Sequence, residues 1–194
     1  MKLNIGSGYK KFKGFLNIDD DPLVNPDYTV NLEEAHLPFE DNTVEEIRAH
    51  HILEHIRNFI PLMQEFYRVC KHGALIDIVA PHHNHEVYYG DPTHVRPITV
   101  NGMYLFSKKH CSTHKAQHDS SSGIAFKYNV DFEVISYDFD YDDFYLPLIN
   151  SFNQRKANNE VSPEEDFAFQ RLMREANNVA INTKIKLMVI KDEQ

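Results

Sequence analysis

The first half of the chain alternates short apolar runs with turn residues, a pattern typical of parallel α/β proteins. Residues 2–5, 15–18, 28–32 and 44–49 are four such runs, and they predict four short strands. Residues 74–80 are almost entirely apolar. This fifth run predicts a central parallel strand that is covered on both faces of its sheet.

Between the fourth and fifth runs, apolar residues recur at spacings of three and four, which predicts one buried face of a helix. These residues are Phe59, Leu62, Met63, Phe66, Tyr67 and Cys70. Asn58 precedes the helix as an N-cap, and Gly73 stands where a helix stop is expected. The pattern therefore predicts a helix that starts after Asn58 and ends before Gly73.

The second half of the chain has a weaker pattern. Residues 82–129 are polar and rich in histidine and serine, and we expect only one short helix there, around residues 103–110. Residues 132–139 alternate as a strand does, and residues 181–190 form a last strand. Between them Ser162 caps a helix that runs to about residue 177. We expect that helix to bury Phe167, Phe169 and Leu172, or some of them.

Size, charge and cysteine content narrow the classes of protein. The 194 residues suit a single domain. The net charge of −9 comes without the basic stripe of a nucleic-acid binder, so we expect no nucleic-acid partner. Two cysteines, Cys70 and Cys111, favour buried thiols over a disulfide. The N-terminus enters an apolar strand without a leader, and no run approaches the ~20 apolar residues of a membrane span. We therefore expect a cytoplasmic protein.

Six segments carry a resemblance to a known family. They are Leu3-Asn4-Ile5-Gly6-Ser7-Gly8, Gly14-Phe15-Leu16-Asn17-Ile18-Asp19, residues 37–47, His51-Ile52-Leu53-Glu54-His55-Ile56, residues 65–73 and Asp91-Pro92-Thr93-His94-Val95-Arg96-Pro97. In this order they resemble the class I SAM-dependent methyltransferases. More narrowly, they look like the small "predicted SAM-dependent methyltransferase" group with a shortened glycine loop.

The resemblance implies an α/β, Rossmann-like class I methyltransferase fold, in three αβα layers, with a mostly parallel sheet and an antiparallel last strand. The connection between the first two strands is shorter than the dozen or so residues of a crossover. We therefore expect the first crossover helix to be absent. We read residues 1–194 as one domain, with a cofactor-binding half (1–81), a variable substrate-side insert (82–129) and a strand–helix–strand unit (130–194).

The resemblance also implies S-adenosyl-L-methionine as the cofactor and assigns residues to it. Gly6, Ser7 and Gly8 would form the cofactor turn, since glycines let the backbone approach a ligand. Asp19 would accept both ribose hydroxyls, with a turn-capping acid as the alternative. Asn31 and Leu32 would lie beside the adenine, unless Asn31 only forms a turn.

His50 and His51, which follow the fourth strand, would line the methionine part of the cofactor, unless one of them caps the strand.

On the acceptor side we expect His82, His83, Asp91 and His94, which follow the fifth strand. A neutral-range histidine suits proton removal from a nucleophile. The alternative is that Asp91 and His94 only hold a loop together, because turn formation explains Asp-Pro without a substrate.

Two histidine sets are candidate metal ligands: His82, His83, His85 and His94, and the helically spaced His110, His114 and His118. The cysteines of a structural zinc site are missing, so we expect no metal.

The function predicted is methyl transfer to an unidentified small-molecule or glycan-type acceptor. A non-catalytic SAM- or nucleoside-binding protein is the alternative, and the glycine turn and Asp19 do not separate the two. An NAD-dependent oxidoreductase is disfavoured, because Lys11 stands where the third fingerprint glycine would be.

Overall fold

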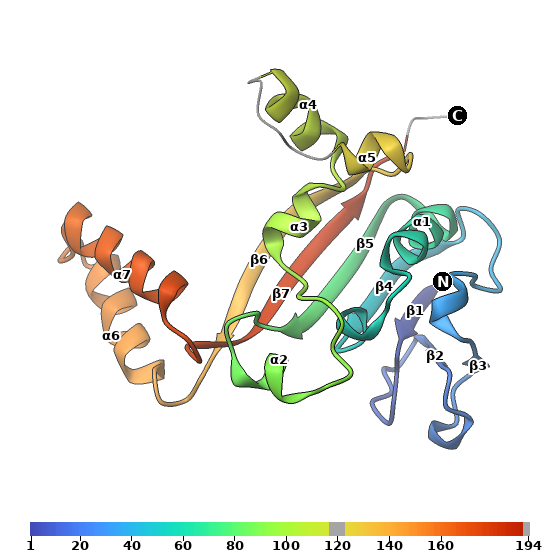
Figure 1. Ribbon diagram of the computed structural model, residues 1–194, viewed down its shortest axis with the longest axis horizontal. Coiled ribbons are helices and arrows are strands. Elements are labelled where there is room, and N and C mark those ends of the chain that lie inside the picture. Colours follow the sequence, from blue (N-terminus) through green and yellow to red (C-terminus); the bar gives the residue numbers. More distant parts are fainter. Residues whose placement is uncertain (117–122, 192–194) are drawn as a thin grey trace.

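The computed structural model describes residues 1–116 and 123–191, which include a seven-stranded sheet in the order β3-β2-β1-β4-β5-β7-β6 (Figure 1). The strands are β1 (Lys2–Ile5), β2 (Leu16–Asp19), β3 (Tyr28–Thr29), β4 (Val44–His50), β5 (Cys70–Pro81), β6 (Phe132–Tyr141) and β7 (Ala180–Val189). Pairing is parallel from β3 across to β5, and β7 runs antiparallel to both of its neighbours. The mostly parallel sheet with an antiparallel last strand is thus confirmed.

Helices follow the strands mainly in the second half of the chain. They are α1 (Phe59–Val69), α2 (Glu86–Gly90), α3 (Val100–Tyr104), α4 (Lys108–Ala116), α5 (Ile124–Lys127), α6 (Leu146–Ala157) and α7 (Pro163–Glu175). The described residues also form the 3-10 turns η1 (Pro22–Val24), η2 (Leu32–Glu34) and η3 (Leu53–His55). In Figure 1, α6 and α7 project away from the sheet, beyond the ends of β6 and β7.

The expected loss of the first crossover helix is confirmed, and the shortening goes further. The chain between β1 and β2, which is described throughout, has no helix, and the connection from β2 to β3 holds only η1. Helices in these connections would form one of the three expected layers. That layer is therefore reduced to turns. The main core lies on the other face, where Phe59 of α1, Phe106 and Phe132 pack edge to face.

The two faces of the sheet have opposite chemistry. On the core face, Ile5, Ala49, Ile78 and Ile185 align across four strands with no exposed surface. On the other face the aligned row is polar and reads Asn4, Arg48, Asp77 and Lys186. The expectation that residues 74–80 are covered on both faces is wrong, since Leu75 is 41% exposed.

Several local predictions also differ from the structure. The third strand ends at Thr29 because Asn31 starts η2, and β5 begins at Cys70 directly after α1, with Gly73 inside the strand at φ +75°. The described part of the region after β5 holds four short helices instead of one, and α6 was not predicted. Ser162 caps α7 as expected, through a bond from the Glu165 amide.

Of the three apolar residues expected to be buried on α7, only Phe169 is partly buried. Phe167 is 71% exposed and Leu172 49% exposed, while Phe169 stacks on Phe152 of α6. The α6–α7 pair therefore packs mainly on itself, at the side of the sheet.

Both cysteines are buried reduced thiols. Across the described residues, none of the helices combines the length and apolarity that crossing a bilayer requires.

Candidate functional site

The glycine turn after β1 takes a backbone conformation that side chains disfavour. Gly6 and Gly8 have φ of +62° and +47°, and the Ser7 amide donates to the Ile18 carbonyl at 3.0 Å. A Cβ on Gly6 would lie 2.5 Å from the Ile52 side chain, whereas one on Gly8 would meet nothing within 4 Å. The turn is therefore packed against Ile52 at Gly6, and it is open beside Gly8.

Asp19 joins the end of β2 to this turn. One carboxylate oxygen accepts the Gly8 amide at 2.7 Å, and the other accepts the Asp21 amide at 3.1 Å. The turn-capping role is thus present. Each oxygen still has a second lone pair, so the carboxylate keeps the capacity for two ribose hydroxyls and fits the predicted cofactor.

Asn31 and Leu32 are placed at the end of β3, as expected, but they are occupied locally. The Asn31 side chain accepts the Glu33 amide at 3.0 Å and caps η2, and Leu32 is 5% exposed within the core. The turn role of Asn31 is therefore observed. Contact with the adenine stays a prediction for both residues.

His50 and His51 diverge at the end of β4. His50 Nε2 lies 3.0 Å from Asp77 Oδ2 on the polar face of the sheet, and that hydrogen bond is the main cause of a lowered pKa for Asp77. His51 has φ +55°, and its side chain is 50% exposed. The chain reversal at His51 turns this second imidazole toward a cavity at the carboxyl edge.

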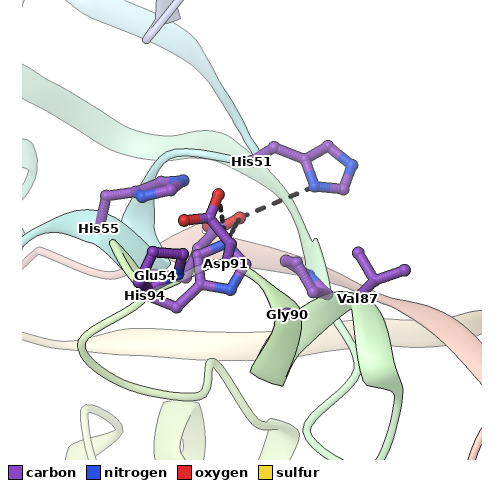
Figure 2. A pocket seen from close by; sticks show the side chains of 9 residues that line it. His51, Glu54, His55, Val87, Gly90, Asp91 and His94 are labelled. Atoms are coloured by element: carbon purple, nitrogen blue, oxygen red, sulfur yellow. Dashed lines mark ion pairs between the residues drawn. The ribbon is translucent and has the colours of Figure 1, made fainter.

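That cavity, here called the histidine–carboxylate cavity, has a volume of about 610 Å³. Its lining comprises His51, Glu54, His55, Pro81, Val87, Gly90, Asp91, Pro92 and His94. Figure 2 shows the Glu54 carboxylate near the centre, with His51 and His55 on opposite sides. Glu54 Oε1 lies 3.7 Å from His51 Nδ1 and 4.0 Å from His94 Nε2, and the Glu54 side chain is only 1% exposed.

The segment 91–97 is fixed onto η3 by backbone contacts. The Val95 amide donates to the Glu54 carbonyl at 2.9 Å, and the Arg96 side chain donates to the Ile56 carbonyl at 3.2 Å. Asp91 Oδ1 accepts both the amide and the hydroxyl of Thr93, and the hydroxyl bond is the main cause of a lowered pKa for Asp91. The loop-holding alternative is therefore correct in structural terms.

The same segment also presents side chains to the cavity. Asp91 Oδ2 lies 3.9 Å from His94 Nε2, and both residues line the cavity. Loop fixation and a place at the cavity therefore coexist, and the acceptor role of Asp91 and His94 stays a prediction.

His82 and His83 line a different cavity of about 590 Å³, here called the aromatic cavity. Tyr104, Tyr137, Phe139 and Tyr141 contribute most of its rings. Burial lowers the pKa of His82 to about 4, with His83 and His85 adding to the effect, and burial also lowers the pKa of His83. The structure thus separates the four expected acceptor-side residues into two pairs.

Glu54 and His55 are the residues that the sequence did not single out, although both lie in a segment of the family resemblance. A Glu-His pair a few residues after the fourth strand was the available signal. Of the second histidine set, His110 stacks on Tyr104, whereas His118 and the His114 side chain lie outside the described residues.

Comparison with known proteins gives one family match. Residues 17–77 match the family described as a methyltransferase domain. No curated protein is significantly similar in sequence.

Solved structures match over nearly the whole chain. A SAM-dependent methyltransferase from Archaeoglobus fulgidus has a TM-score of 0.57 at 15% identity, covering 96% of this chain and 85% of its own. A SAM-dependent methyltransferase from Thermotoga maritima has 0.55 at 9% identity, covering 96% and 80%. The [4+2]-cyclase SpnF has 0.54 at 12% identity, covering 98% and 75%.

At these identities the structures establish the fold alone, and the cyclase among them illustrates why. The family match adds a methyltransferase domain over residues 17–77, which include Asp19, His50 and His51. Together they confirm the class I methyltransferase fold and support, over residues 17–77, the prediction of a methyltransferase domain.

Proposed function

We propose that this protein is a SAM-dependent methyltransferase and that it acts on a small-molecule or glycan-type acceptor bound in the histidine–carboxylate cavity. The observation that carries the proposal is the position of that cavity. The cavity opens at the carboxyl end of β4. Ile52 lies between the lining residues His51 and Glu54 in the sequence, and its side chain packs against Gly6 of the glycine turn. In doubly wound sheets this edge is where ligands bind.

Cofactor and acceptor must meet with their reacting atoms about 3 to 3.5 Å apart. Bound S-adenosyl-L-methionine would supply a methyl group already activated on its sulfonium. Asp19 and the open backbone at Gly8 would hold the ribose end, which leaves the methyl end toward His51. The cavity volume of about 610 Å³ suits a ligand of sugar or drug size.

The chain's own groups would orient the acceptor and accept its proton. His51, Asp91 and His94 offer nitrogen and oxygen atoms along the cavity wall. A neutral imidazole is a suitable general base near neutral pH. The net charge of −9 argues against a phosphate-rich polymer as the acceptor.

Calorimetric titration with S-adenosyl-L-methionine and S-adenosylhomocysteine tests the cofactor part, with NAD as the comparison ligand. We expect Asp19→Ala to weaken both by roughly 10- to 100-fold, because two hydrogen bonds to a charged group are lost. Asp20→Ala is the matched control, since Asp20 is the exposed neighbour. Equal binding in the Asp19 and Asp20 variants would contradict the ribose role.

Transfer of a labelled methyl group to a panel of sugars, alcohols and amines tests the acceptor part. We expect transfer in the wild type and its loss in His94→Ala, with cofactor affinity unchanged. Tight cofactor binding without transfer to any member of the panel would favour the non-catalytic alternative.

A further inference from the structure

We propose that Glu54, His55 and His94 form a binding site for a divalent first-row transition ion, with zinc(II) as the representative. One ligand atom from each side chain lies within 4.8 Å of the other two. All three residues line the histidine–carboxylate cavity. One carboxylate with two imidazoles is a donor set that such ions prefer.

The Glu54 carboxylate is the strongest indication of a missing cation. Both of its oxygens are buried without a hydrogen-bond partner among the described residues. A buried carboxylate with no hydrogen bond is costly, and native proteins rarely leave one so. The nearest nitrogens, at 3.7 Å and 4.0 Å, are too far for hydrogen bonds. A cation between these atoms would compensate the charge.

The hydrogen bonds around the two histidines keep one ring nitrogen of each available. His94 Nδ1 lies 2.7 Å from the Tyr88 carbonyl, which only accepts, so Nδ1 carries a proton and, in the neutral ring, Nε2 keeps the lone pair. His94 Nε2 is the atom that faces Glu54. Metal-ligating histidines are normally oriented by such a bond from the opposite nitrogen.

The same reasoning applies to His55. Its Nδ1 lies 2.8 Å from the Thr93 hydroxyl, and that hydroxyl donates its one proton to Asp91. His55 Nδ1 must therefore donate to Thr93, which in the neutral ring leaves the lone pair on Nε2. Asp91 and Thr93 thus act as orienting groups behind the ligand.

The site is built on two segments that are already fixed to each other. Glu54 and His55 lie on η3, His94 lies in the segment 91–97, and the Val95 amide bonds to the Glu54 carbonyl. Ligand atoms around one zinc ion lie roughly 3 to 4 Å apart. Side-chain rotations that move the three ligand atoms by about an ångström would bring each of them to bonding distance from one zinc ion.

Three protein ligands leave coordination positions open toward the cavity. This part rests on the proposed methyl transfer and specifies its acceptor as an oxygen nucleophile, an alcohol or a diol. The bound ion would favour loss of the hydroxyl proton to water through the half-exposed His51. The oxygen would then form a bond to the methyl carbon as the carbon–sulfur bond breaks, giving a methyl ether and S-adenosylhomocysteine.

Titration of zinc into tag-free, chelator-treated protein, in competition with a chromophoric chelator, tests the site. We expect one ion per chain in the wild type and at least 100-fold weaker binding in His94→Ala and Glu54→Gln. His36→Ala is the matched control, because His36 also lies 3.7 Å from a buried glutamate, Glu65, but outside the three-residue cluster. His83→Ala controls for the neighbouring histidines.

Wild-type binding that persists in both site variants, or is lost in His83→Ala, would overturn the proposal. So would the absence of stoichiometric zinc in folded wild-type protein. Thermal melting separates metal binding from a structural role of Glu54. Without metal, Glu54→Gln should melt no lower than the wild type, and zinc should raise the melting temperature of the wild type but not that of Glu54→Gln. A Glu54→Gln protein that melts lower without metal and is still raised by zinc would contradict the assignment.

Titration of S-adenosyl-L-methionine into the same metal-free samples distinguishes this proposal from the proposed function. Cofactor binding through Asp19 does not require the ion. Protein that binds the cofactor but not zinc overturns the metal site alone. Protein that binds zinc but not the cofactor leaves the metal site supported and overturns the proposed function.

Discussion

The two cavities at the end of β5 use the same residue type in opposite settings. In the histidine–carboxylate cavity, imidazoles face Glu54 and Asp91, and each orienting bond leaves a nitrogen lone pair. In the aromatic cavity, His82 lies among rings and other histidines, and its pKa falls to about 4. Histidine content alone therefore does not identify reactive histidines, whereas neighbouring carboxylates and the direction of each hydrogen bond do.

The largest expected effect comes from the glycine turn that supports only the first cavity. Gly6→Ala forces a side chain into the left-handed region and against Ile52, 2.5 Å away. We expect a loss of about 3 kcal/mol in unfolding free energy, from strain and overpacking together. Urea denaturation measures it. Gly123→Ala is the control, because its Cβ meets nothing within 4 Å; an equal loss there would contradict the argument.

The next effect is catalytic and separates the two pairs of expected acceptor residues. We expect His94→Ala to lower kcat/KM by roughly 100-fold, which corresponds to about 3 kcal/mol of transition-state stabilisation. His83→Ala should lower it by less than about threefold, because a desolvated imidazole without an acidic partner has no place in the transfer. Steady-state kinetics with the acceptor identified in the panel of sugars, alcohols and amines measures both ratios. The reverse ranking would move the acceptor to the aromatic cavity.

A pH effect should come from the aromatic cavity. The pKa of His82 is lowered from 6.5 to about 4 in the folded protein, so the unfolded chain binds the proton more strongly. The stabilisation is therefore full above the unfolded pKa and is lost as the pH falls toward 4. We expect a loss of about 2 kcal/mol between pH 7 and pH 5. Urea denaturation should show a smaller loss of unfolding free energy between pH 7 and pH 5 in His82→Asn than in the wild type. An equal loss in the two proteins would contradict the assignment.

The smallest effect tests the double role of Asp91. Asp91→Asn keeps an oxygen for the Thr93 turn but removes the charge beside His94. We expect unfolding free energy to change by less than about 0.5 kcal/mol and zinc affinity to fall roughly tenfold. Asp91→Ala should lower both. A large stability loss in the Asn variant would show that the charge, and not the turn oxygen, holds the loop.

Much of the fold follows from local pattern. The apolar runs and the three–four spacing of α1 are each decided within a few residues, so strand order along the chain and the parallel class were predictable. The helix α6 was missed because it buries only Ile149 and Phe152 and packs against α7 instead of the sheet. The open polar face was missed because its exposure depends on connections that lack helices.

The site was less predictable than the fold. Gly6 and Asp19 follow adjacent strands, so their meeting at one edge could be expected. The Glu54–His94 cluster instead depends on bonds between segments about 40 positions apart, such as the backbone bond from the Val95 amide to the Glu54 carbonyl. A single sequence carries no signal for that contact, and the turn residues of segment 91–97 suggested only a loop.

The position of β7 has a consequence for synthesis on the ribosome. Strand β7 follows β5 and β6 in the sequence but lies between them in the sheet, so β5 waits unpaired on one side, and β6 without its neighbour in the described sheet, until residues 180–189 emerge. Thr183 and Ala180 of that strand also wall the aromatic cavity. A chain that stops short of β7 therefore loses an interior strand and exposes two unpaired strand edges that invite aggregation.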